Sequence, residues 1–535
     1  MAISGLVLLI ACANVANLLL ARGLARKQEI SLRTALGANR GQLIRQLLTE
    51  SVLLALLSGI VGLAVSYVGT SMLLALAFGD AQRLPVDPSP SLPVLLFACA
   101  LALVTGVLFG IAPAWITSQT DPVEALRTGT RSTSSGASLV QRALVVLQAG
   151  LSLVLLTGAG LFSQSLNKLQ HSNLRLESKD RYIVHLNPQA AGYSQIQLES
   201  LYRTIRERFH AIPGVKNVGI TIYTPMEDNN WSTGIEVKGQ PDPHAGASVV
   251  KVNFEYFDSV GTHVLMGRGI SERDTPTAEA VAVVNQEFAK KFFPNQNPIG
   301  RYFGTGPESA GDYKIAGVVE DTTYTTVRWK AHRMYFLPIL QRQPSDKEPI
   351  ERDLSLYAGA LVIQTERPMN QMAALVQKTL AGINPNLAVV KFQTFDQQIA
   401  DRFTEERMVA RLTTLFGALA LLLATIGLYG VTTYTAASRT AEIGIRMALG
   451  AARTGVIAMV MRGAMIQTAL GLAIGIPTSL FCVRFIESQL FDIKGVDIDV
   501  LLTAILTLLI AASLAGAIPA QRAASTDPAR ALRTE

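Results

Sequence analysis

An acidic and a basic residue stand four positions apart in two nearly identical strings of this 535-residue sequence. The strings are KQEISLRTALGANR at 27–40 and TAEIGIRMALGAAR at 440–453. The aligned pairs are Glu29 with Arg33 and Glu442 with Arg446. Such a pair can form an ion pair on a helix, but it stabilises the helix by only about 0.2–0.5 kcal/mol. Helix stability alone therefore does not explain two copies, and the repeat indicates a surface that binds a partner.

Each string ends in a glycine that predicts the end of a helix. Gly37 and Gly450 follow a leucine, and each is followed by an alanine, Ala38 or Ala451. Glycine is the residue most often found just after a helix, where the backbone turns left-handed. We therefore expect a short amphipathic helix at the membrane surface in each copy.

A second repeated pair follows the first in the same order. Its strings are PAWITSQTDPVEALRT at 113–128 and PAQRAASTDPARALRT at 519–534. Asp121 and Asp527 each precede a proline, which predicts a helix N-cap followed by proline at the first helical position. The resulting tail helices end near Arg127 and Arg533. Two pairs in the same order indicate an internal duplication, whose copies are related by an axis along the membrane normal.

The sequence lacks the residue spacings that are typical of metal sites, nucleophilic catalysis and nucleotide binding. The six histidines, at 171, 185, 210, 244, 263 and 332, lack the spacing of metal ligands. No nucleophile motif of the G-x-S-x-G type occurs, and no G-x-x-x-x-G-K-[ST] phosphate loop occurs. We therefore expect no metal, no cofactor and no catalytic residue, and we expect that the chain is not an enzyme.

Long apolar segments must position the repeated strings. Hydrophobic residues make up 49% of the chain and charged residues 16%, and a helix crosses a bilayer with roughly 20 apolar residues. The sequence predicts seven spans, at 1–21, 47–78, 94–117, 141–165, 408–436, 460–487 and 499–521.

Charges in the connections predict the orientation of the spans. The segment 22–45 is rich in arginine, whereas 79–93 has one arginine and two aspartates. Basic connections remain in the cytoplasm, so both repeated strings and both tails are predicted inside and residues 166–405 outside. The net charge of +7 lies mostly at span ends, so we expect contact with the lipid bilayer and no nucleic acid.

The segment 166–405 reads as a soluble α+β domain. Two β-α-β patterns, at 181–223 and 359–393, flank a β-rich insert at about 230–350, which predicts a ferredoxin-like subdomain with a second lobe. All three cysteines, at 12, 99 and 482, lie in spans, so we expect no disulfide in this domain. Tyr223, Met226 and Trp231 could form an apolar contact surface or belong to the core, and we favour the core.

These strings resemble the permease subunits of MacB/FtsX/LolC-type ABC transporters, and most closely the duplicated bacterial orphan permeases. EISLRTALGANR and EIGIRMALGAAR resemble the family's loop between its second and third spans. YFDSVGTHVLMGRGI, VAVVNQEFAKKFFPNQNPIG and YKIAGVVEDTTY resemble its periplasmic-domain signature. The resemblance implies a polytopic α-helical protein of the bacterial inner membrane. Its parts are a first module at 1–128, a span at 141–165, a periplasmic core domain at 166–405 and a second module at 406–535.

The resemblance also implies partners and a mechanism. A separate cytoplasmic ABC ATPase would dock on the repeated strings, so that the ATPase-coupling residues are Glu29, Arg33, Gly37, Ala38, Glu442, Arg446, Gly450 and Ala451. By mechanotransmission, the long spans would then move the periplasmic domain, which engages a periplasmic or outer-membrane partner. Efflux or extraction of an antibiotic, peptide or lipoprotein is the expected outcome.

Other functions stay open. A signalling scaffold would pass a conformational change to a periplasmic partner without transport. Since symmetry predicts a first span and a first periplasmic domain before Met1, an inactive truncated remnant is a further alternative. A proton-coupled carrier is disfavoured because it needs ionisable groups mid-membrane, and the notable polar side chains of the spans are Asn14, Asn17 and Gln148.

Overall fold

The computed structural model of the chain describes residues 2–25, 40–77, 89, 91–118, 135–238, 246–306, 309–325, 332–345, 347–493, 495 and 497–525. The chain forms two compact units. The helical unit comprises Met1–Lys168 with Glu406–Glu535, and the sheet unit comprises Leu169–Glu405.

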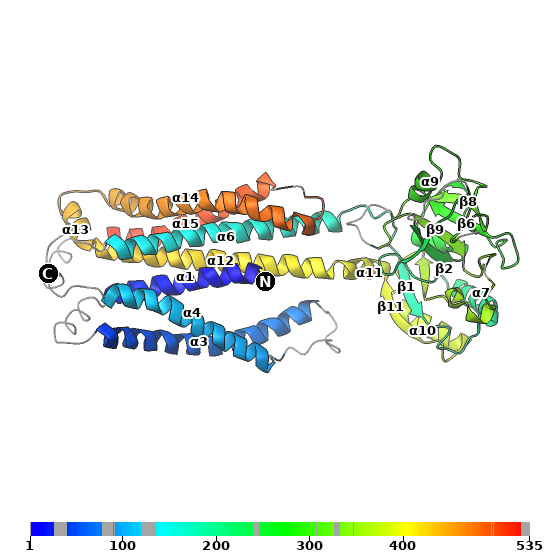
Figure 1. The fold of residues 1–535 in the computed structure, drawn as a ribbon, viewed down its shortest axis with the longest axis horizontal. Helices are drawn as coiled ribbons and strands as arrows, with labels where there is room; N and C mark the ends of the chain where they lie inside the picture. The colour runs from blue at the N-terminus through cyan, green and yellow to red at the C-terminus, as the bar shows by residue number, and fades with distance from the viewer. Residues whose placement is uncertain are drawn as a thin grey trace. The chain divides into compact units, whose positions relative to one another are not determined.

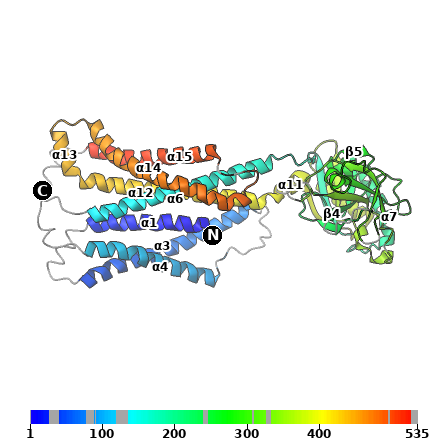
Figure 2. The same ribbon diagram turned by 45° about the horizontal axis from the view of Figure 1, so that its top comes forward.

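Long apolar helices build the helical unit (Figure 1). They are α1 (Ala2–Ala25), α3 (Arg40–Ala77), α4 (Leu92–Ser118), α6 (Ser135–Gln170), α12 (Thr404–Ser438), α14 (Arg453–Ile486) and α15 (Ile498–Ala524). The short helix α13 (Thr440–Ala448) lies between α12 and α14 in the chain, and a 3-10 turn at Glu487–Gln489 follows α14. α3 lies beside α4, and α14 lies beside α15, in both Figure 1 and Figure 2.

Among the described residues, six helices are apolar and long enough to cross a membrane. Their apolar segments are Ile3–Leu20, Ile44–Met72, Leu139–Gln170, Thr404–Ser438, Arg453–Gln489 and Ile498–Ala524. They match six of the predicted spans. The remaining one, predicted at 94–117, falls on α4, whose described apolar stretch is the shorter segment Leu92–Val107. That span stays a prediction.

Small residues bring the helices of this unit close together. A Cβ on Gly150 of α6 would lie 3.3 Å from the carbonyl oxygen of Gly471 on α14. A Cβ on Gly475 of α14 would lie 3.0 Å from the Cα of Gly150. Because apolar helices in lipid gain little from excluding water, such close backbone contact is a main source of their association.

The polar side chains noted in the spans lie inside this packing. Asn14, Asn17 and Gln148 are 5%, 4% and 0% exposed. The side-chain amide of Asn14 donates a hydrogen bond of 2.7 Å to the carbonyl oxygen of Leu423 on α12. An amide without a partner is costly in an apolar interior, so this bond favours one position of α1 against α12.

The sheet unit alternates strands with short helices. Its helices are α7 (Leu198–His210), α8 (Tyr256–Val260), α9 (Gln286–Phe292), α10 (Met372–Ile383) and α11 (Phe395–Arg402), with 3-10 turns at Gln195–Gln197, Ile350–Arg352 and Leu354–Leu356. Its strands are β1 (Arg181–Leu186), β2 (Val215–Thr221), β3 (Trp231–Gly234), β4 (Gly246–Val252), β5 (Val264–Gly267), β6 (Val281–Asn285), β7 (Tyr302–Phe303), β8 (Tyr313–Val319), β9 (Met334–Pro338), β10 (Ala360–Thr365) and β11 (Val389–Thr394).

The strands form one sheet in the order β11-β1-β10-β2-β4-β9-β6-β8-β5, with β3 paired to β4 and β7 paired to β8. The first four strands of this order are mutually antiparallel neighbours. α7 connects β1 to β2, and α10 connects β10 to β11. This connectivity is the β-α-β-β-α-β pattern of split β-α-β folds, and its elements occupy the two segments for which β-α-β units are predicted.

The inserted strands continue the sheet rather than forming a separate one. β4 joins β2 where Thr221 pairs with Val252. Beyond this junction the insert has its own core, which includes Phe288, Phe303 and Tyr335. The predicted insert is therefore an extension of one sheet with a second hydrophobic cluster.

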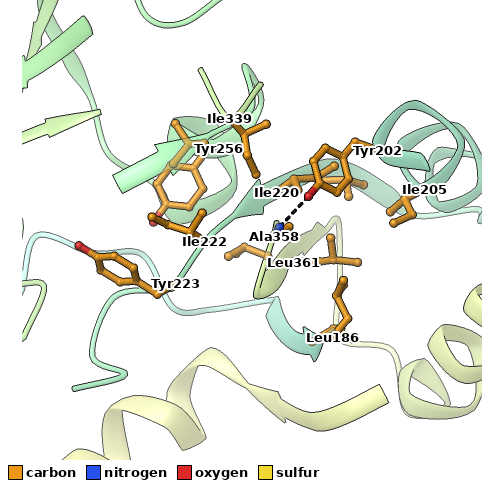
Figure 3. Close-up of a cluster of buried hydrophobic side chains, with 14 of the residues drawn as sticks. Leu186, Tyr202, Ile205, Ile220, Ile222, Tyr223, Tyr256, Ile339, Ala358 and Leu361 are labelled. Carbon is orange, nitrogen blue, oxygen red and sulfur yellow. Dashed lines mark hydrogen bonds between the residues drawn. The ribbon is translucent and has the colours of Figure 1, made fainter. Parts of the chain in front are cut away.

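The main core of the sheet unit packs α7 against β2 and β10 (Figure 3). The hydroxyl of Tyr202 accepts a hydrogen bond of 2.6 Å from the amide of Ala358 and donates one of 2.7 Å to the carbonyl of Leu356. Burial raises the pKa of Tyr202, so its hydroxyl stays protonated and keeps both bonds. Ile205 and Leu361 beside it are fully buried.

Candidate functional site

The structure describes one of the two copies of the repeated string. Residues 440–451 form α13 and the turn that leads to α14. Outside the described residues lie the other copy and the predicted tail positions, namely Glu29, Arg33, Gly37, Ala38, Asp121, Arg127, Asp527 and Arg533. The candidate site is therefore built on α13.

The helix ends at the predicted glycine. The amide of Gly450 donates a hydrogen bond of 3.1 Å to the carbonyl of Met447, and the amide of Ala451 donates one of 3.0 Å to the carbonyl of Arg446. These two bonds make a Schellman motif. Gly450 has a φ of 92°, which an L side chain would strain. Gly450 and Ala451 thus fix where α13 stops, through their backbones.

One side of α13 is anchored to the helical unit. Ile443 is 2% exposed and packs in a cluster with Val456 of α14 and Ala524 of α15. Met447 adds to the same cluster from the next turn. α13 is therefore held against the ends of two long helices rather than suspended in a loop.

The other side of α13 is exposed and carries residues of two kinds. Glu442, Ile445, Arg446 and Leu449 have the i, i+3, i+4, i+7 spacing of one helix face, and we call them the α13 face. Ile445 is 50% exposed and Leu449 is 83% exposed. An apolar pair beside an ion pair has the mixed character of a protein contact surface.

The two charged residues of the α13 face hold each other in place. Nη2 of Arg446 lies 2.7 Å from Oε1 of Glu442. Nη1 of Arg446 donates a second hydrogen bond, of 2.9 Å, to the sulfur of Met459 on α14. Both charged side chains are about half exposed, so the pair adds at most about 1 kcal/mol to stability. Its main consequence is that the charges occupy defined positions on the surface.

Ile445 and Leu449 are not among the residues predicted from the sequence. The repeat does carry a signal for them, because Leu32 and Leu36 occupy the aligned positions of the first string. Both copies thus have an apolar residue at these two positions, on the same helix face as the charged pair. This repetition is the signal in the sequence that could have identified Ile445 and Leu449.

The sheet unit offers fewer candidates for chemistry. Among the described residues, no group of three or more His, Cys, Asp and Glu is placed to hold a metal ion. Tyr223 and Met226 are buried, in agreement with the core prediction. Trp231 is 45% exposed, and here the prediction is wrong: Trp231 lies on β3, which pairs with β4 off the main path of the sheet.

Comparison with known families gives matches along most of the chain. The FtsX-like permease C-terminal family matches residues 1–122 and 414–528, and the MacB-like periplasmic core domain family matches residues 143–379. α13 lies within the second FtsX-like segment.

Individual relatives match parts of the chain. The uncharacterized ABC transporter permease YknZ of Bacillus subtilis (strain 168) is 36% identical over 125 residues, which are 23% of this chain and 30% of that protein. The macrolide export ATP-binding/permease protein MacB 2 of Aeromonas hydrophila is 27% identical over 314 residues, which are 54% of this chain and 44% of that protein. The chain thus spans less than half the length of these relatives.

Among solved structures, the periplasmic region of MacB from Actinobacillus actinomycetemcomitans aligns with 43% of this chain and 95% of its own, at 14% identity and a TM-score of 0.29.

The two FtsX-like segments enclose one MacB-like periplasmic core domain. The chain therefore belongs to the MacB/FtsX-like family of ABC transporter permeases.

Proposed function

We propose that this chain is the membrane-spanning permease subunit through which a separate cytoplasmic ATPase moves a periplasmic domain. In this proposal, residues 1–128 and 406–535 are the two permease modules, 141–165 is a span, and 166–405 is the periplasmic core domain. The α13 face docks on the ATPase. The cargo is a hydrophobic substrate that is exported or extracted from the membrane.

The observation that carries the proposal is that α13 has one exposed face, one anchored face and a fixed end. Its outer face is free to bind, whereas Ile443 anchors its inner face and the Schellman motif fixes its end. A force on the α13 face is therefore passed to α14 and α15 instead of being absorbed by a flexible loop. This is the mechanical property that coupling to an ATPase requires.

The connection to α12 supports the same mechanism. α12 ends at Ser438 and α13 begins at Thr440, so a single residue separates them. α12 has 35 residues, which corresponds to about 52 Å at 1.5 Å per residue. The hydrocarbon core is about 30 Å thick. A helix of this length can carry a displacement from one side of the membrane to the other.

The charge distribution supports placing α13 in the cytoplasm of a bacterial cell, with the protein in the inner membrane. Arg439, Arg446, Arg453 and Arg522 lie at or near the ends of α12, α13, α14 and α15 that meet there. Clustered arginines next to span ends favour the cytoplasmic side. The next connection along the chain, between α14 and α15, then lies in the periplasm.

The substrate is proposed only as a class. The relatives include a macrolide export ATP-binding/permease protein and a pyoverdine export ATP-binding/permease protein. From these names we take export as the activity. Antibiotics, peptides and lipoproteins remain the candidate substrates, and a periplasmic or outer-membrane partner remains a candidate receiver.

Reversing the charges of the α13 face tests the proposal. The chain would be purified from its native host as wild type and as Glu442→Lys with Arg446→Glu, and the bound cytoplasmic proteins identified. The double exchange keeps an ion pair at i, i+4 spacing, but it places both charges against the helix dipole, which costs about 0.3–1 kcal/mol per charge. We expect an ABC ATPase with the wild type and at least tenfold less of it with the variant.

The matched control is the same exchange at Glu348 and Arg352, an exposed i, i+4 pair of the sheet unit. It should leave ATPase capture unchanged. Capture of the ATPase equally by wild type and by the α13 variant would contradict docking at α13. Absence of any ATPase from the wild type would contradict the coupling itself and favour a signalling scaffold.

A further inference from the structure

The helical unit contains a cavity of about 970 Å³ between α6, α12, α13 and α14. Its walls are mainly apolar, with Val146 from α6 and Leu470 and Ile474 from α14. α6 and α14 cross in Figure 2, and they are in contact where a Cβ on Gly475 would lie 3.0 Å from the Cα of Gly150. A cavity of this size takes a ligand with tens of non-hydrogen atoms, because binding pockets for such ligands measure roughly 300–1,000 Å³.

Three arginines line the cavity. They are Arg142 on α6, Arg439 between α12 and α13, and Arg462 on α14. No aspartate or glutamate of the described chain is among the lining residues. None of the three arginines forms an ion pair within the part of the chain that the structure describes. The cavity therefore has an uncompensated positive charge, which matches an anionic ligand.

The stretch of the cavity from Arg462 to Ile474 has the length of one leaflet of a bilayer, and the lining on α14 continues beyond it to Thr478. Arg462 and Ile474 line the same cavity on α14. The twelve residues from one to the other correspond to about 18 Å along the helix axis. Half of a hydrocarbon core of about 30 Å is about 15 Å. A ligand that reaches from the arginines to Ile474 thus has the length of a lipid in one leaflet.

We propose that this cavity binds an anionic phospholipid. The phosphate lies among Arg142, Arg439 and Arg462, and an acyl chain runs along the apolar wall to Ile474. Guanidinium groups pair with phosphate through two parallel hydrogen bonds. Basic pockets between membrane helices at the cytoplasmic side are the places where anionic head groups bind.

The site lies behind the α13 face and is distinct from it. Ile443, the anchoring residue of α13, lines the cavity, and so does Met459, whose sulfur accepts the hydrogen bond from Arg446. A bound lipid therefore contacts the anchored side of α13, while the α13 face stays free. The lipid would support the position of α13, and its binding does not depend on an ATPase.

Native mass spectrometry of the purified full chain tests the proposal. Phosphatidylglycerol and phosphatidylcholine with the same acyl chains would be titrated separately onto the delipidated protein. We expect phosphatidylglycerol to bind at least tenfold more tightly. Replacing Arg142, Arg439 and Arg462 by glutamine should weaken its binding on the order of 100-fold, because each arginine near a membrane surface attracts anionic lipid.

The control removes the same charge elsewhere. Arg411, Arg453 and Arg484 are exposed arginines of the helical unit that do not line the cavity. Their replacement by glutamine should leave the affinity within about threefold of wild type. An equal loss in both triple variants, or equal binding of the two lipids to the wild type, would overturn the proposal.

A second variant fills the cavity without changing its charge. Gly463 lines the cavity and has open space where a Cβ would lie. Gly463→Trp should displace phosphatidylglycerol, whereas Gly455→Trp, at an equally open position of α14 outside the cavity, should not. Retention of the lipid by Gly463→Trp would overturn the proposal. A mass spectrum in which the wild-type chain is a dimer without bound lipid would overturn it as well.

Discussion

Replacement of Gly427 by alanine should loosen α1 from the helical unit. Gly427 lies on α12, and a Cβ there would lie 2.5 Å from Oδ1 of Asn14 and 2.5 Å from Oε1 of Gln148. Both amides would have to rotate away. Because Asn14 is 5% exposed and Gln148 is fully buried, the surrounding helices offer little room for that rotation, and the bond from Asn14 to Leu423 would be stretched.

The expected magnitude follows from two effects. Inserting a methyl group into a packed interior costs about 1–3 kcal/mol. A side-chain hydrogen bond between membrane helices contributes about 0.6 kcal/mol on average. A total of about 2 kcal/mol shifts the equilibrium between packed and detached α1 by about 30-fold, at 1.4 kcal/mol per factor of ten.

Cys12 provides the assay. It lies on α1, two residues before Asn14, and is buried. In a chain with Cys99 and Cys482 replaced by alanine, a membrane-permeant thiol reagent labels Cys12 only when α1 detaches, so the labelling rate follows the opening equilibrium. Gly427→Ala should raise that rate about 30-fold. Gly430→Ala should not, because the space at its Cβ is open.

Restoring the space should restore the packing. When Asn14 and Gln148 are also replaced by alanine, Gly427→Ala no longer meets either amide. The labelling rate should then be the same with glycine or alanine at position 427. Equal rates for Gly427→Ala and Gly430→Ala in the chain that keeps both amides would refute the reasoning.

Further predictions concern each unit. Leu449→Ser should weaken ATPase binding on the order of 30-fold, measured by titration of the reconstituted pair, since burying a leucine contributes about 2 kcal/mol; unchanged binding would exclude Leu449 from the contact. Tyr202→Phe should lower the free energy of unfolding of residues 169–405 in urea by about 1–3 kcal/mol, because the amide of Ala358 loses its partner; no change would contradict that bond. The pKa of Asp274 is lowered. Burial alone would raise it, but hydrogen bonds from Arg268 and from the backbone and side chain of Ser271 outweigh burial. Its stabilising effect is complete above its unfolded pKa and is lost as the pH falls through its folded pKa. Asp274→Asn should therefore destabilise the sheet unit at neutral pH, and the difference from wild type in urea unfolding should shrink as the pH falls through the folded pKa of Asp274.

The sequence predicts the ends and charges of α13 better than its orientation. Gly450 and the pair of Glu442 with Arg446 are local features, set by residues within one or two turns. Ile443 and Ile445 are the same residue type, yet Ile443 is buried and Ile445 is half exposed. Which of them packs inward depends on α14 and α15, whose contacts with α13 come from distant parts of the chain.

The cavity illustrates the same limit over a longer range. Arg142, Arg439 and Arg462 come from three separate helices or connections. Each arginine alone reads as an ordinary basic residue at a span end. Only their common position around one cavity distinguishes them, and no spacing in the sequence encodes it.

The two modules have similar sequences but different neighbours. When the repeated strings are aligned, small residues of α3 fall at the positions of small residues of α14: Ser58, Gly62 and Ser66 align with Gly471, Gly475 and Ser479. On α14, Gly471 and Gly475 pack against α6, and Ser479 is 1% exposed. On α3, the aligned residues are exposed. Aligned small residues therefore lie on helices in both segments, but the packing of each helix is decided by what lies beside it.

Aligned glycines should consequently differ in their tolerance of a larger side chain. A Cβ on Gly475 would lie 3.0 Å from the backbone of Gly150, whereas nothing lies within 4 Å of one on Gly62. Valine at position 475 must push α6 away, at a cost of about 1–3 kcal/mol, while valine at position 62 meets no described neighbour. Thermal unfolding of the detergent-solubilised chain should therefore shift for Gly475→Val and stay nearly constant for Gly62→Val. Equal shifts would mean that α6 packs no more closely on Gly475 than the surroundings of α3 pack on Gly62, and would refute the reasoning.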